Sequence, residues 1–255
     1  MKGHAMIPKR LMAAMLLISS AILASDRAEV IVQVSTMDAL MSGLYDGDRT
    51  LRELEAYGDF GIGTNEGLDG EMIRVDGKFY RILADGTAQI PDPGTRTPFA
   101  TLTFFDSDIQ ACLPAGTDFP SFMKTADGKI PSSNIFYAVR IKGSFSRVVT
   151  RSVPRQSKPY APLPGILKTR PVLEHKDVDG VMAGFRFPAW FKGIQVPGYH
   201  LHFLTGDGRS GGHVLEFTVQ RAQMELDETE SFRLDLPKIR EFLEAELGGA
   251  ETAGE

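Results

Sequence analysis

Alternating apolar and polar residues, interrupted by short turns, run through most of the chain and predict a β-rich protein. Residues 71–75 and 78–83 flank Asp76-Gly77, a favoured two-residue turn, and therefore predict a β-hairpin. Further strands are predicted over residues 29–35, 98–105, 134–143, 145–150, 180–187 and 231–236, with a short edge strand at 88–90. Three helices are expected, over residues 37–45, 51–57 and 238–247, the first of them after the capping residue Thr36.

A second predicted hairpin carries three histidines. Side chains alternate along a strand, so His200 and His202 project from the same side. Residues 205–212 read Thr-Gly-Asp-Gly-Arg-Ser-Gly-Gly, which is a turn composition, and His213 begins the returning strand. Only 5 histidines occur in the chain, so three in this window predict a metal site. Three imidazoles and one open position are typical of catalytic Zn²⁺. Imidazole ligands alone leave nickel, iron and manganese open.

The middle of the chain contains a proline-rich stretch, residues 153–171. Such a stretch suits neither a central strand nor a helix, so it predicts a domain boundary. We therefore expect an α+β, β-rich fold with two lobes. The N-terminal lobe, residues 26–152, would hold a mixed β-sheet. The smaller lobe, residues 172–255, would be antiparallel, β-barrel-like and the carrier of the metal site.

The N-terminus has the tripartite pattern of a secretory signal. Lys2, Lys9 and Arg10 precede an apolar run over residues 11–24, which predicts a signal peptide over residues 1–25. The run is too short for a spanning helix, so we expect no stable membrane insertion of the mature protein. An exported protein, periplasmic or secreted, follows from this interpretation. The protein would stay cytoplasmic if the segment were not a working signal.

Composition narrows the range of partners. The net charge is −5 and no basic run follows the chain, which argues against nucleic acid and for a small-molecule substrate. Cys112 is the single cysteine, so an intramolecular disulfide and a thiolate zinc site are both excluded.

Several segments together resemble the alpha-acetolactate decarboxylase family. They are residues 32–47, 58–64, 67–72, 99–105, 143–155 and 197–203, followed by Gly211-Gly-His213. The resemblance extends from about Val30 to Leu247 and rests on the order of these motifs. It implies zinc bound by His200, His202 and His213. It also implies decarboxylation of 2-acetolactate to acetoin and CO₂ through a metal-stabilised enediolate, by a homodimer.

The same resemblance implies further site residues. They are Glu71 in the Leu-Asp-Gly-Glu motif, Arg151 after the long strand, and a glutamate of the C-terminal tail. Glu251 and Glu255 are both candidates for the tail residue, and Glu251 is preferred. Read without the resemblance, Arg147 and Arg155 compete with Arg151 as the site cation.

Three local features add to these expectations. The chain has Asn65-Glu66 where the family has Phe-Asn, which places an extra carboxylate near the site. Glu216 is a candidate partner for an imidazole N–H of the histidine hairpin. His175 lies in a polar stretch and is expected to be exposed.

Two other functions fit the histidine pattern. One is another three-histidine metal enzyme on a β-barrel, cupin-like or carbonic-anhydrase-like. The resemblance over residues 32–72 argues against it. The other is an exported module that binds metal for storage or structure, for which a closed shell of four protein ligands would be the expected sign.

Overall fold

The computed structural model describes residues 29–247 and contains two main sheets. The larger is a seven-stranded sheet in the order β14-β1-β8-β3-β4-β5-β6. Its strands are β1 (Val30–Val34), β3 (Phe60–Thr64), β4 (Glu71–Val75), β5 (Lys78–Ile82), β6 (Ala88–Gln89), β8 (Phe99–Thr103) and β14 (Ser231–Asp235). Only β1 and β14 run parallel, so the sheet is mixed, and its parallel strand β14 comes from the C-terminal part of the chain.

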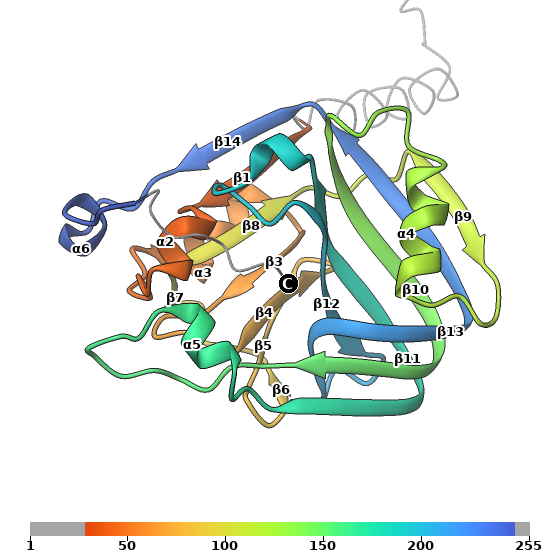
Figure 1. The fold of residues 1–255 in the computed structure, drawn as a ribbon, viewed down its shortest axis with the longest axis horizontal. Coiled ribbons are helices and arrows are strands. Elements are labelled where there is room, and N and C mark those ends of the chain that lie inside the picture. The colour runs from red at the N-terminus through yellow and green to blue at the C-terminus, as the bar shows by residue number, and fades with distance from the viewer. Residues whose placement is uncertain (1–28, 248–255) are drawn as a thin grey trace, which may run out of the picture.

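The second sheet has five antiparallel strands in the order β10-β11-β12-β13-β9. They are β9 (Ile109–Leu113), β10 (Phe136–Arg151), β11 (Val172–Phe187), β12 (Gly198–Thr205) and β13 (Gly211–Thr229). β10 also pairs with β13, which closes strands β10 to β13 on themselves. Figure 1 shows these green-to-blue strands beside the orange and yellow strands of the seven-stranded sheet. A two-stranded ribbon of β2 (Arg49–Thr50) and β7 (Arg96–Thr97) completes the strands.

The helices are short. They are α2 (Met37–Met41), α3 (Leu51–Leu54), α4 (Phe119–Asp127), α5 (Leu163–Leu167) and α6 (Arg240–Leu243), with 3-10 turns η1 (Glu55–Tyr57) and η2 (Ala189–Phe191). Thr36 caps α2 by accepting a bond from the Ala39 N–H, and Thr50 forms a capping box with Glu53 on α3. The first two predicted helices are therefore confirmed at their starts, whereas the predicted C-terminal helix is a single turn.

The proline-rich connection differs from its prediction in one respect. It contains the helix α5, because Pro164 lies in the first turn, where a missing N–H and a fixed φ are tolerated. The connection joins β10 to β11, which are neighbours in the five-stranded sheet. The division into two lobes and the barrel-like shape of the second remain predictions.

The two sheets pack face to face through large apolar side chains. Phe60, Ile62 and Ile73 from the seven-stranded sheet belong to one buried cluster with Phe185 and Leu204 from the five-stranded sheet. A separate buried cluster fills the five-stranded sheet's own core and includes side chains of α4. The interface between the sheets is where polar groups from both can meet in a dry environment.

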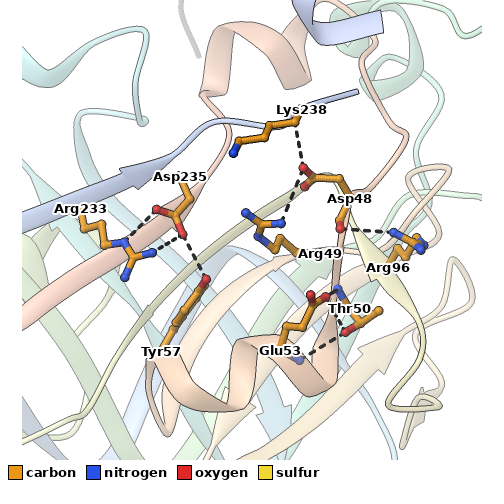
Figure 2. A network of polar contacts seen from close by, with 9 residues as sticks. All are labelled: Asp48, Arg49, Thr50, Glu53, Tyr57, Arg96, Arg233, Asp235 and Lys238. Atoms are coloured by element: carbon orange, nitrogen blue, oxygen red, sulfur yellow. Dashed lines mark hydrogen bonds and ion pairs between the residues drawn. The ribbon is translucent and has the colours of Figure 1, made fainter. Parts of the chain in front are cut away.

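A polar network connects the C-terminal segment to residues 48–57 (Figure 2). The Tyr57 hydroxyl donates to the Asp235 carboxylate at 3.1 Å, and the Lys238 backbone N–H donates to the Asp48 carboxylate at 3.0 Å. These contacts fix the path of the chain as it leaves β14 towards α6, at the far left of Figure 1.

Both ends of the chain lie outside the described residues, and with them the predicted signal segment and the tail glutamates Glu251 and Glu255. Within residues 29–247, no helix combines the length and the apolar character needed to cross a membrane.

Asp227 is a buried carboxyl with a testable effect on stability. It is 2% exposed and accepts one bond from the Asp106 backbone N–H. Burial raises its pKa to about 7; the bond from the Asp106 N–H opposes this rise, and the charges of Asp108, Glu29 and Asp106 contribute to it. Between pH 4 and pH 7 the unfolded chain loses this proton while the folded chain keeps it. The free energy of unfolding therefore falls as pH rises through this window.

Asp227→Asn removes this titration while preserving an acceptor for Asp106. Relative to the parent protein, we expect its free energy of unfolding to rise from pH 4 to pH 8, by about 4 kcal/mol at most. Denaturant unfolding at pH 4, 6 and 8 measures the difference. Asp76→Asn, in the exposed β4–β5 turn, is the control and should show no such trend. If the free energies of unfolding of Asp227→Asn and the parent protein change in parallel with pH, the prediction is contradicted.

Candidate metal centre

The hairpin of β12 and β13 brings the three histidines together, as predicted. His202 and His213 are direct cross-strand partners, and His200 lies two residues before His202 on the same face. Gly211 and Gly212 make this pairing possible. A Cβ on Gly211 would lie 2.1 Å from the Phe203 carbonyl oxygen, and Gly212 has a φ of +148°.

The three imidazoles surround one point. Their ring centroids are 4.8 to 5.4 Å apart, and one ligand atom from each lies within 4.8 Å of the others. His200 Nε2 and His213 Nδ1 are 3.1 Å apart. Among the described residues, this is the one cluster of His, Cys, Asp or Glu with the geometry to hold a metal ion.

His202 is oriented by the other sheet. Its Nδ1–H donates to the backbone carbonyl of Met72 on β4 at 2.8 Å. A carbonyl only accepts, so the proton lies on Nδ1 and the Nε2 lone pair faces the site. His202 is 1% exposed, which makes this bond across the sheet interface a strong constraint on the ring.

Glu71 lies beside the histidines at the start of β4. It pairs with Thr64 on β3, and its carboxylate oxygen Oε2 is 3.5 Å from His202 Nε2. Burial raises the pKa of Glu71 to about 7, and the positive charge of Arg151 partly opposes that shift. Glu71 can therefore hold or release a proton near neutral pH.

Arg151 is the cation that reaches this place. It ends β10 opposite His213, is 6% exposed, and its Nη2 lies 3.1 Å from His213 Nε2. Arg147 instead pairs with Glu174 and Glu216 on the surface.

Arg155 is also no part of the cluster, since it is largely exposed with Asp69 as its ion-pair partner. The expectation that Glu216 supports an imidazole was wrong, because its carboxylate binds Arg147 on the exposed side of the sheet. The structure therefore brings together Glu71, Arg151 and the three histidines.

The histidines are held neutral. Burial lowers the pKa of His202 to about 4, against the opposing effect of its bond to Met72. Burial also lowers the pKa values of His200 and His213 well below the usual range, and the charge of Arg151 adds to this effect. Neutral imidazole is the form that binds metal.

The donor set fits a metal such as zinc. Tetrahedral zinc with Zn–N bonds of roughly 2.0–2.1 Å has ligand nitrogens about 3.3 Å apart, close to the His200–His213 separation of 3.1 Å. Within residues 29–247, His202 Nε2 is buried and has no hydrogen-bond partner. Buried ring nitrogens of this kind are the atoms that a metal ion satisfies.

Comparison with known proteins gives the family. The family model described as "Alpha-acetolactate decarboxylase" matches residues 31–249. The chain belongs to the alpha-acetolactate decarboxylase family. The alpha-acetolactate decarboxylase of Methylococcus capsulatus is 44% identical over 217 residues, covering 85% of this chain and 84% of that protein. The one from Bacillus subtilis is 43% identical and covers 88% of each.

Solved structures agree. The crystal structure of alpha-acetolactate decarboxylase from Bacillus subtilis strain 168 superposes with a TM-score of 0.83 at 43% identity, covering 85% of this chain and 93% of that one. A Staphylococcus aureus protein described as similar to alpha-acetolactate decarboxylase gives a TM-score of 0.83 at 31% identity. The family resemblance and the β-rich α+β fold class are therefore confirmed.

The β3–β4 loop holds Asn65 and Glu66 close to the site residue Glu71. Asn65 is buried, and its Nδ2 donates to the Asp69 carbonyl at 3.2 Å, so it closes the loop that ends at Glu71. Glu66 is half-buried in the same loop.

Sequence reasoning missed the Met72 carbonyl, because a backbone acceptor leaves no mark in the residue pattern.

We expect the purified enzyme to retain one divalent metal ion per chain. His213→Ala should weaken metal binding by at least about 100-fold, since losing a ligand should cost no less than losing a residue that only hydrogen-bonds to a ligand. Elemental analysis after gel filtration measures the metal, with circular dichroism as the check on folding. Glu216→Gln alters an exposed neighbour on β13 and should retain the full complement. A full complement in His213→Ala would contradict the assignment.

Proposed function

We propose that this chain is a zinc-dependent decarboxylase that converts 2-acetolactate to acetoin and CO₂. The observation that carries the proposal is the convergence of three neutral imidazoles with Arg151 and Glu71 at the interface of the two sheets. Membership of the alpha-acetolactate decarboxylase family supports the substrate and the reaction.

His200, His202 and His213 would hold the zinc ion, because three nitrogen ligands and an open position suit a catalytic site. When bound, zinc supplies Lewis-acid stabilisation of the negative charge that develops on the substrate oxygens. The reaction exchanges no electrons with the protein, so a metal without redox chemistry is sufficient.

Arg151 binds the carboxylate of the substrate. A guanidinium matches a carboxylate with two parallel N–H donors, and its burial strengthens the interaction. The bond between this carboxylate and the adjoining carbon breaks, CO₂ leaves, and the electron pair moves into the neighbouring ketone as an enediolate. Arg151 then remains close to the charge that has formed.

Glu71 supplies the proton that the carbon needs. With a pKa raised to about 7, its protonated form is well populated at neutral pH. Transfer to one face of the enediolate gives a single enantiomer of acetoin, and Glu71 regains a proton from solvent. We assign a second carboxylate to the C-terminal tail, where Glu251 is preferred over Glu255.

We further propose that residues 1–25 are removed on export and that the mature enzyme is a homodimer. The basic residues ahead of an apolar run support the first proposal. The family resemblance supports the second.

Acetoin formation from racemic acetolactate tests the proposed reaction directly. We expect activity that disappears with a chelator and returns with zinc. A protein that binds one metal per chain yet forms no acetoin would sink the proposal and favour an exported metal-binding module.

Arg151→Lys should reduce kcat/KM for acetolactate about 10–100-fold, because an ammonium cannot bind the carboxylate with two parallel bonds. Arg147→Lys, four residues earlier on the same strand, makes the same chemical change at an exposed ion pair and should leave kcat/KM unchanged. Steady-state assays compare the two variants. Equal effects would show that Arg151 has no special contact with the substrate.

A further inference from the structure

His175 has an environment that the sequence did not predict. It lies on β11, opposite Val148 of β10, and is half-buried instead of exposed. Val148 and Phe203 belong to the five-stranded sheet's own core, and the His175 ring packs edge-to-face on Phe203 with centroids 5.5 Å apart. His175 therefore contacts the side of the strands that faces away from the metal centre.

Two hydrogen bonds connect His175 to the start of β13. His175 Nε2 is 3.2 Å from the Thr150 hydroxyl, which is 3.2 Å from the Gly211 carbonyl oxygen. A carbonyl only accepts, so the single hydroxyl proton of Thr150 points to Gly211. The hydroxyl oxygen then accepts from His175 Nε2–H. We call these two bonds the His175 relay.

Each contact of the relay adjoins a residue of the candidate centre. Thr150 immediately precedes Arg151 on β10. Phe203 immediately follows His202 on β12, and Gly211 lies two residues before His213 on β13. One imidazole is thus linked to three strands at the points where those strands present the candidate site residues.

The backbone ladder alone is weak at this place. The β10–β13 register shifts between Val149 and Thr150, because Val149 pairs with Glu216 whereas Thr150 pairs with Val214. Such a bulge leaves a strand locally free to bend. The relay supplies a side-chain constraint where the regular pairing is interrupted.

We propose that His175 and Thr150 are positioning residues, which hold β10, β12 and β13 so that Arg151 and the three histidines face one another. They touch neither the metal nor the substrate and act through the backbone. The inference rests on the proposed function only in that the three histidines bind a metal.

Thr150→Val removes the hydroxyl and keeps the branched shape. We expect it to weaken zinc binding about tenfold. This is the lower end of the loss of metal affinity seen when residues that hold metal ligands in place are mutated. Thr150→Ser keeps the hydroxyl, so its zinc affinity should stay within about twofold of that of the parent protein. Competition with a chromophoric chelator measures the zinc affinity of the full chain.

His175→Phe preserves an aromatic ring against Phe203 and removes both ring nitrogens, including the Nε2–H that donates to Thr150. It should weaken zinc binding by a smaller factor than Thr150→Val, since the Thr150–Gly211 bond remains. The double variant should bind no more weakly than Thr150→Val alone, because His175 has no acceptor once the hydroxyl is gone. If each substitution weakens zinc binding by its own factor and the two factors multiply in the double variant, the His175 relay is overturned.

Thr103→Val is the matched control. Its hydroxyl is also buried and donates to a backbone carbonyl, that of Val30, at 3.2 Å, in the other sheet. It should reduce stability much as Thr150→Val does and leave zinc affinity unchanged. Equal zinc affinities for Thr150→Val and Thr103→Val would overturn the inference. A parent protein that binds zinc but forms no acetoin would overturn the proposed function alone, while one that binds no zinc would overturn both.

Discussion

The hydrogen bond from His202 Nδ1 to the Met72 carbonyl is the interaction on which the candidate centre depends. It crosses from the five-stranded sheet to the seven-stranded sheet inside a dry interface. Because Met72 follows Glu71 on β4, the same contact that fixes the ring also fixes the distance between His202 and the Glu71 carboxylate. Any shift of one sheet against the other would therefore disturb the tautomer, the ligand geometry and the carboxylate together.

One physical cause, burial, gives these groups opposite and complementary properties. Desolvation disfavours charge, so it lowers the pKa values of the histidines and raises that of Glu71. The imidazoles are thereby neutral and available to a metal, while the carboxyl carries a proton that it can release near neutral pH. Arg151 supplies a fixed positive charge, which limits the rise of the Glu71 pKa and provides a place for an anionic substrate.

Local patterns predicted the hairpins and the histidine cluster, because alternation and glycine-rich turns are short-range signals. They did not select Glu71 or Arg151, which reach the centre through the packing of two sheets and were identified by resemblance. Glu216 was misjudged because nearness in sequence does not show which partner a side chain binds, and its carboxylate pairs with Arg147. The helix α4 was missed, although Asp118 caps it, and α5 formed where prolines had argued against any helix.

Diffraction from crystals of the zinc-loaded enzyme, measured on both sides of the zinc absorption edge, tests the account most directly. We expect one anomalous peak per chain, bonded to nitrogens of His200, His202 and His213 and adjacent to Glu71. A peak elsewhere, or a zinc ion closed off by four protein ligands, would contradict it.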